Sequence, residues 1–552
     1  MNKSNLSHPV TPAIVVGLLL FIPIIVSFYY IGTQTIFNLF AADSMYYMGI
    51  ANNFLKFGIP TFDGETVING FHPLWELVLI GMFKILSIKH YYQIYAVFAL
   101  SALLVYTAYI TISHTLVKIV GARPGLVATF TLFPGAYSIF FAPQRHLFNA
   151  PGTIGTFSPC SAINGMETSL SLTLWALFFF TTISRFRVLS QEKNISYDVE
   201  SFFPFSTRIC LALIVLSRLD DCFLVISLSV FVLSLNDISF QKKINSLIHI
   251  LLPTVVVLLI YITFNELTAG SLLPVSGTSK TSFAITGNLH NLFMVLTGQS
   301  GIMEWWYLAY CFYSIILALL VGTSCIFVGR RFKNLNSVLP ENSLMMSLLN
   351  VFGWFLVLKA LFLFIFVPVV HQGYWYYFPM VVICNVIFAI AVGFYIKNNN
   401  KNTLAVLFVS LAVIFFRMPN EIYLIKSSTD HNTPNYATIS YALWNNGDEI
   451  RKFLAESAPN AKLIDNLDGM YVYLLDIPGD SITGLASSSK ELTRRKEIGV
   501  MPSLVSRGFS ILPSYGYMNP NALPQNIRIV DVFNPPSSPV SFYRVALTTG
   551  TQ

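Results

Sequence analysis

Apolar segments separated by short polar stretches run from near the first residue to about residue 417, and they constrain the fold more than any other feature. Hydrophobic residues make up 54% of the chain and charged residues only 11%, which excludes an ordinary soluble globular protein. Since roughly 20 apolar residues cross a bilayer, the sequence predicts a polytopic α-helical membrane protein. We expect about eleven spans, at 13–33, 92–117, 124–142, 165–184, 207–219, 222–236, 247–264, 305–328, 346–369, 373–396 and 402–417. The pair 207–219 and 222–236 is short and fits either a tilted hairpin or a single broken helix.

Basic residues between the expected spans predict the orientation, because cytoplasmic loops concentrate Lys and Arg. With the N-terminus in the cytoplasm, every basic cluster between spans falls on the cytoplasmic side, including Lys118 with Arg123, Arg185 with Arg187, Lys242 with Lys243, Arg330 with Arg331, and Lys397 with Lys401. The segments 34–72, 143–164, 218–221 and 265–304 then face outward. The apolar segment 73–89 is short and contains Glu76 and Lys84. We expect it to be re-entrant or interfacial, since a full span would invert several later loops.

The sequence changes character after residue 417, where apolar runs become short and turn residues frequent. We therefore divide the chain into a membrane domain, 1–417, and a soluble extracytoplasmic domain, 418–552. In the second domain, Ala461–Ile464, Tyr471–Leu475 and Ile527–Val532 are predicted strands and Tyr441–Ala455 a predicted helix. This indicates a small α/β or α+β domain. It contains none of the six cysteines, so no disulfide framework is expected there.

The segment Phe40 to Trp75 contains the first candidate for chemistry. Asp43 follows the presumed exit of the first span, and the residues from Tyr46 and Tyr47 onward have helical apolar spacing up to a stop at Gly58. Ionisable groups at membrane margins are often functional, so Asp43 is a candidate site residue. The alternative is an ordinary hydrated loop with one acid.

Three strings in this segment, DSMYYMGIANNFL, TFDG and NGFHPLW, carry a resemblance to a known family. The segment resembles the first outer loop of bacterial GT-C membrane glycosyltransferases, which are similar to protein O-mannosyltransferases and lipid A aminoarabinose transferases. The resemblance implies a sugar donor linked to polyprenyl phosphate, Asp43 as the general base, and a substrate loop that includes Tyr46, Tyr47, Asn69, His72 and Trp75. Members often carry two adjacent acids where this chain has Ala42 and Asp43. A divalent cation, which some members use there, is left open, and no metal ligand is assigned.

Glu167 is the second candidate acid. It lies in the string NGMET at the outer start of an expected span, and a similar string occurs in the family. The resemblance implies that Glu167 orients the acceptor or supports a cation. The alternative is an acid that complements a helix dipole.

Cationic residues at outer boundaries are candidates for holding the donor phosphate. Arg145 with its neighbour His146, Arg218, Lys280 and His371 have this position. Arg218 stands beside Asp220 and Asp221, so an internal ion pair is the alternative. Lys280 ends the string LLPVSGTSK, which resembles a family loop, and its alternative is a solvated lysine in a turn. His371 precedes an aromatic group and fits either a phosphate contact or a boundary histidine.

The residues and the resemblance together favour a GT-C glycosyltransferase of the bacterial inner membrane. It would transfer a hexose or pentose from a polyprenyl-phosphate carrier, with inversion, to a glycan, lipid or protein outside the cytoplasm. No basic tract suited to nucleic acid is present. A glycolipid transporter or flippase, or a non-catalytic envelope assembly protein, is the alternative.

Overall fold

Seven of the described helices are long and apolar enough to cross a membrane. The computed structural model describes residues 10–136, 162–191, 203–235, 239–299, 302–333, 340–369, 372, 374–412, 436–465, 467, 469–482, 489–515 and 523–548. The seven helices are α1 (Val10–Ile31), α5 (His90–Val120), α7 (Thr168–Gln191), α10 (Phe240–Ala269), α13 (Ile302–Lys333), α14 (Pro340–Phe366) and α15 (Phe378–Asn398). The polytopic helical class is thus confirmed. The other four expected spans coincide with shorter helices, namely α6 (Ala122–Ala136), α8 (Phe205–Ser217), α9 (Phe223–Leu233) and Thr403–Ala412.

The segment after α1 is helical for much of its length. It forms α2 (Gln34–Leu39) and α3 (Ala42–Phe57), and α3 ends as predicted at Gly58, whose φ of +76° is left-handed. After a polar turn comes α4 (Pro73–Ile85), which has 13 residues. At a rise of about 1.5 Å per residue α4 is roughly 20 Å long, shorter than the hydrocarbon core. It is not among the helices that could span a membrane.

Short elements connect the long helices near the candidate site. The helix η5 (Leu219–Cys222) joins α8 to α9, and Arg218 before it has an extended backbone. Two further short helices, α11 (Val275–Lys280) and α12 (Ile285–Thr297), follow α10, and η7 (Tyr374–Tyr376) precedes α15.

The C-terminal part folds around a five-stranded mixed sheet in the order β2-β1-β3-β5-β4. Its strands are β1 (Lys462–Asp465), β2 (Gly479–Ser481), β3 (Phe509–Pro513), β4 (Ile527–Phe533) and β5 (Phe542–Leu547), and its helices are α17 (Tyr436–Ser457), α18 (Met470–Leu475), α19 (Ser489–Ile498) and α20 (Val500–Ser506). The small α/β or α+β domain is confirmed, as are the first and third predicted strands and the predicted helix. The strand predicted at Tyr471–Leu475 is wrong, because these residues form α18. All of them are buried, and a fully buried apolar run has no periodicity that separates strand from helix.

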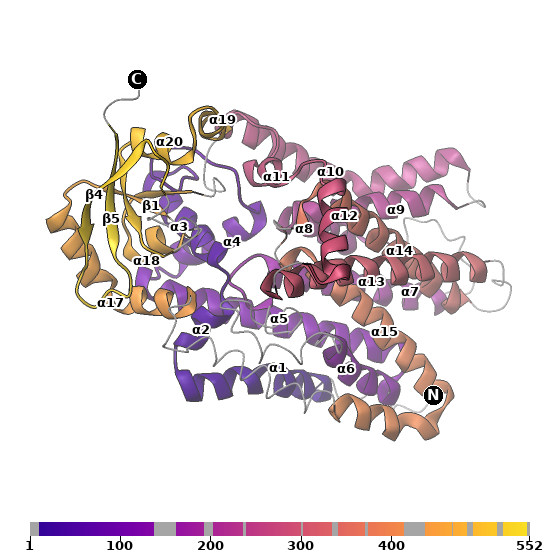
Figure 1. Cartoon of the computed structure of the whole chain (residues 1–552). Helices are drawn as coiled ribbons and strands as arrows, with labels where there is room; N and C mark the ends of the chain where they lie inside the picture. Colours follow the sequence, from indigo (N-terminus) through magenta and orange to yellow (C-terminus); the bar gives the residue numbers. More distant parts are fainter. Residues whose placement is uncertain are drawn as a thin grey trace.

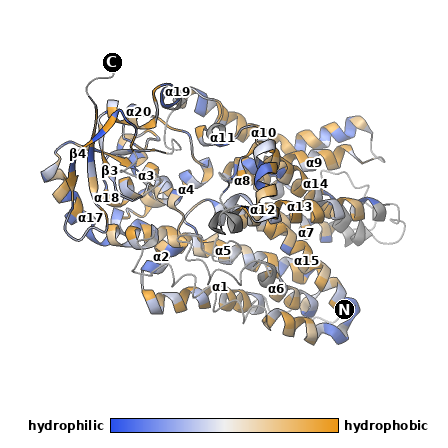
Figure 2. Cartoon of the chain, in the orientation of Figure 1, coloured by the Kyte–Doolittle hydropathy of each residue, from blue (hydrophilic) through white to orange (hydrophobic). Residues whose placement is uncertain are grey.

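Two large apolar clusters explain how the parts are held together. The first lies among the long helices. The second joins residues of α2, α3, α4 and α5 to residues of α17 and α18, so the C-terminal domain shares a hydrophobic core with the first outer segment. Figure 1 shows the sheet and its helices packed beside α2, α3 and α4, at one end of the helical bundle. Figure 2 shows that hydrophobic residues predominate on the long helices.

Candidate active site

The start of α3 places Asp43 beside the turn that carries Glu167. Asp43 is half-buried in the first turn of α3, where a carboxylate complements the helix dipole. The backbone N–H of Ala41 donates to the carbonyl of Asn164 at 3.0 Å. The indole N–H of Trp75, at the start of α4, donates to the carbonyl of Gly165 at 3.3 Å. The predicted substrate loop and the NGMET turn therefore meet, although about 100 residues of sequence separate them.

Glu167 is completely buried and accepts a hydrogen bond from Arg218 Nη1 at 2.9 Å. His72, the residue just before α4, places its Nε2 3.6 Å from the same carboxylate oxygen. Burial lowers the pKa of His72, and Glu167 only partly opposes this, which favours the neutral imidazole. Glu167 is therefore fixed by a permanent cation and faces a neutral histidine.

Arg218 is engaged by a second carboxylate in a two-pronged geometry. Its Nε and Nη2 each lie 3.2 Å from an oxygen of Asp220. Burial raises the pKa of Asp220, but the charges of Arg218 and Lys359 outweigh this effect and hold the pKa well below its ordinary value. Arg218 therefore forms the internal ion pair that was the alternative interpretation of this residue. A direct contact of Arg218 with phosphate stays a prediction.

Lys359 of α14 completes this group of charges. Its side chain is fully buried, lies 3.0 Å from Asp220 Oδ2 and also forms an ion pair with Asp221. Asp221 in turn accepts hydrogen bonds from Trp175 Nε1 at 3.0 Å and Ser171 Oγ at 3.3 Å. Because Glu167, Asp220 and Asp221 face Arg218 and Lys359, we call these five residues the charge cluster.

Tyr376 lies between the charge cluster and Lys280. Its ring centroid is 5.7 Å from Arg218 Cζ and 5.9 Å from Lys280 Nζ, distances suited to cation–π contact. Burial raises the pKa of Tyr376, and among the charges that act on it are those of Lys280 and Asp43. Tyr47 similarly has a pKa raised first by burial and then by Glu167 and Asp43. The charges of Asp43, Glu167, Arg218 and Lys280 therefore each affect the pKa of Tyr47, of Tyr376 or of both.

The other predicted site residues fall into three groups: one that holds a loop, two that are buried, and two that lie outside the described residues. Asn69 donates its side-chain N–H groups to the carbonyls of Ser271 and Leu273, and its side-chain oxygen accepts from the N–H of Val275, so it fixes the loop before Lys280. Tyr46 and Trp75 are buried. Arg145 and His371 lie outside the described residues.

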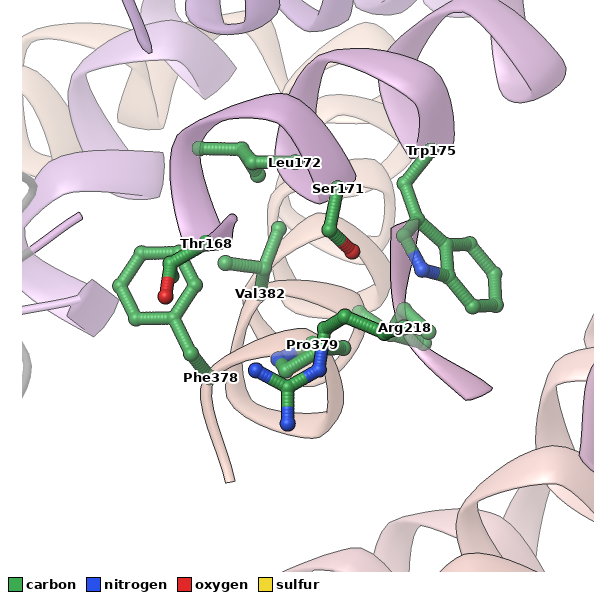
Figure 3. A pocket seen from close by; sticks show the side chains of 9 residues that line it. Thr168, Ser171, Leu172, Trp175, Arg218, Phe378, Pro379 and Val382 are labelled. Carbon is green, nitrogen blue, oxygen red and sulfur yellow. The ribbon is translucent and has the colours of Figure 1, made fainter. Parts of the chain in front are cut away.

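A pocket adjoins the charge cluster on its apolar side. Figure 3 shows Arg218 among the side chains that line it, between the start of α7 and the start of α15. The other lining residues are mostly apolar, namely Thr168, Ser171, Leu172, Trp175, Phe378, Pro379, Val382 and Ile383.

Two buried charged residues near this region escaped prediction from the sequence. Lys359 stands alone in the apolar segment 346–369, and a lone charge in a span is a signal that could have found it. Glu76 of α4 is 1% exposed, and within the described chain its two carboxylate oxygens have no hydrogen-bond partner. Burial raises its pKa well above the ordinary value.

The described residues contain no group of three or more His, Cys, Asp or Glu side chains placed to hold a metal ion. Asp43 and Glu167 could together contribute two carboxylates, and Glu167 is already paired with Arg218. The residues described therefore do not form a ready cation site.

No protein-family description and no curated protein matches the chain. Among solved structures it is similar to ArnT from Cupriavidus metallidurans bound to undecaprenyl phosphate, with 11% identity, a TM-score of 0.48 and coverage of 98% of this chain and 99% of that one. It is also similar to the Archaeoglobus fulgidus oligosaccharyltransferase in complex with zinc and sulfate, with 13% identity, a TM-score of 0.48 and coverage of 97% and 73%. With TM-scores below 0.5, these similarities leave the activity to be argued from the site.

Proposed function

We propose that the chain is a membrane glycosyltransferase that moves one sugar from a polyprenyl-phosphate carrier to an acceptor outside the cytoplasm. The observation that carries the proposal is the convergence of Asp43, Glu167, Arg218 and Lys280 around Tyr47 and Tyr376, beside an apolar pocket. An acid near the membrane margin can accept a proton, whereas the cations can hold a phosphate. The resemblance of the Phe40–Trp75 segment to GT-C enzymes supports the same reaction class.

The reaction needs one base and one phosphate-binding group. Asp43 would take the proton of the acceptor hydroxyl as the oxygen attacks the anomeric carbon on the face opposite the phosphate. The bond between that carbon and the phosphate oxygen breaks, and its electron pair leaves on the polyprenyl phosphate, so the anomeric configuration is inverted. Asp43 is half-buried in the first turn of α3, so its carboxylate stays partly accessible to an acceptor hydroxyl.

Lys280 is the residue we assign to the departing phosphate. It is partly exposed, whereas Arg218 is 1% exposed and already engaged by Glu167 and Asp220. Arg218 would therefore act mainly as a fixed positive charge behind Tyr376, while the lysine contacts phosphate oxygens directly. Arg145 and His371 are the next candidates for the phosphate. Glu167, fixed by Arg218, would orient the acceptor.

The proposed partners are a lipid-linked sugar, with a hexose or pentose, and a glycan, lipid or protein acceptor in the bacterial envelope. Asp43, the C-terminal domain and the segment that contains Lys280 would face the extracytoplasmic side, and the N-terminus would face the cytoplasm. The one-sided distribution of Lys and Arg supports this orientation.

Reconstitution in liposomes tests the proposal. The purified protein is supplied with a panel of polyprenyl-phosphate hexoses and pentoses, labelled in the sugar, and with an envelope glycan extract. We expect one donor to be converted to polyprenyl phosphate while the label enters the glycan with inverted anomeric configuration. Movement of the intact donor between leaflets without transfer would instead identify a flippase and refute the proposal.

A further inference from the structure

Gly469 of the C-terminal domain touches the backbone of α3. Its φ is +94°, and a Cβ atom at this position would lie 2.7 Å from both the backbone N and the Cα of Tyr46. A real Cβ does not approach backbone atoms so closely. Because the contact is with backbone, no rotation of a side chain could relieve it. This position therefore requires glycine for two independent reasons, its conformation and its contact.

The contact is one helical turn from Asp43. Residues i and i+3 lie on the same side of a helix, so a displacement at Tyr46 is transmitted to Asp43. The NGMET turn holds the same part of α3 through another glycine, since a Cβ at Gly165 would lie 2.7 Å from Ser44 Cβ. Two glycines therefore set the position of the first turn of α3, one from the turn that bears Glu167 and one from the C-terminal domain.

The other end of α3 is tied to the same domain through Arg507. Asn53, near the end of α3, donates its side-chain N–H groups to the carbonyls of Thr61 at 3.2 Å and Phe62 at 2.9 Å. The next residue, Asp63, forms an ion pair with Arg507, which also pairs with Asp480 of β2. The polar turn after α3 is thus connected to the sheet by one arginine between two largely buried carboxylates.

We propose that Gly469 and Arg507 are positioning residues for Asp43, so that the C-terminal domain forms part of the catalytic machinery and is not a separable recognition module. The inference rests on the proposed transferase function for its catalytic part. The shared apolar core of α2, α3, α17 and α18 supports it, since separation of the domain would expose the side of α3 that the domain now covers.

Gly469→Ala tests the steric contact, and Gly298→Ala is its matched control. Gly298 ends α12 with a left-handed backbone like that of Gly469, at a φ of +69°, but a Cβ there would meet nothing within 4 Å. Both variants therefore place alanine in a left-handed backbone, and only the first pushes on α3. Because a misplacement of about 1 Å can cost about 10²-fold, we expect Gly469→Ala to lower kcat by about that factor while the donor KM changes by less than about twofold. Equal rates in the two variants would overturn the proposal.

A second arm measures position without catalysis. In the double variant Asp63→Asn with Arg507→Gln the carboxylate and the cation are removed together, and Asp480 keeps its ion pair with Arg495. We expect amide hydrogen exchange to become faster in α3 and unchanged in α4, while Arg451→Ala, which breaks only two exposed ion pairs, leaves both unchanged. Unchanged exchange in α3 would overturn the positioning role. If the parent chain transfers no sugar but the double variant still shows faster exchange in α3, the proposed function is refuted. The coupling between the C-terminal domain and α3 would then still stand.

Discussion

Replacement of Lys359 with methionine should strongly destabilise the protein. The charge cluster holds three carboxylates against two cations, and the loss of Lys359 leaves two of its negative charges without compensation. Removal of one partner of a buried ion pair typically costs about 3–5 kcal/mol. Asp221 keeps its hydrogen bonds from Trp175 and Ser171, so we expect a value near the lower end, about 3 kcal/mol.

The assay is unfolding of the purified protein in detergent, compared among Lys359→Met, Asp221→Asn and the double variant. Because the double variant removes the unpaired carboxylate, its loss of stability should be well below the sum of the two single losses. Lys84→Met is the control, since Lys84 is an exposed lysine on the apolar helix α4. If Lys359→Met unfolds like the Lys84 control, or if the two losses simply add, the charge cluster does not stabilise the fold as argued.

Asp43→Asn should lower the transfer rate by about 10²–10⁴-fold with folding and donor binding intact, as kcat and donor-binding assays of the purified variant would show. Lys280→Ala should weaken donor binding as well as slow transfer, because the phosphate is anionic before the reaction; unchanged binding would direct attention to Arg145 and His371. Alkaline phosphatase fused after Asn420 should be active and fusions within 329–340 inactive, and the reverse pattern would invert the orientation. Burial raises the pKa of Asp480 from 3.8 to about 6. Between these two pKa values the folded state binds more protons than the unfolded state. The contribution of Asp480 to the free energy of unfolding should therefore fall as the pH rises through this range and level off above it. Asp480→Asn should remove this pH dependence, which unfolding measured across the range would show.

Local patterns in the sequence were enough to predict the elements that depend on local physics. The length of the apolar segments placed the long helices, Gly58 marked the end of α3, and a short apolar run in a turn-rich region predicted β4. The position of Glu167 at the start of a helix was also visible, because its string precedes the apolar run of α7.

Contacts between distant segments could not be predicted in the same way. Lys359 meets Asp220 and Asp221 across about 140 residues of sequence, and no local pattern names that partner. Asn69, predicted as a substrate-loop residue, also hydrogen-bonds the loop before Lys280 across about 200 residues, a contact that its local sequence does not indicate. The apolar run at Tyr471–Leu475 has no periodicity that separates strand from helix. In the structure it is a helix, packed against α3 and α17.

We propose that this chain adds a sugar to an envelope component with Asp43 as the base. The decisive experiment is mass analysis of surface glycans in a strain that lacks the protein and carries either the parent chain or Asp43→Asn. We predict that the parent restores a glycan mass larger by one sugar residue, whereas Asp43→Asn, expressed at the same level, leaves the smaller mass. Restoration of the full mass by Asp43→Asn would show that Asp43 is not the base.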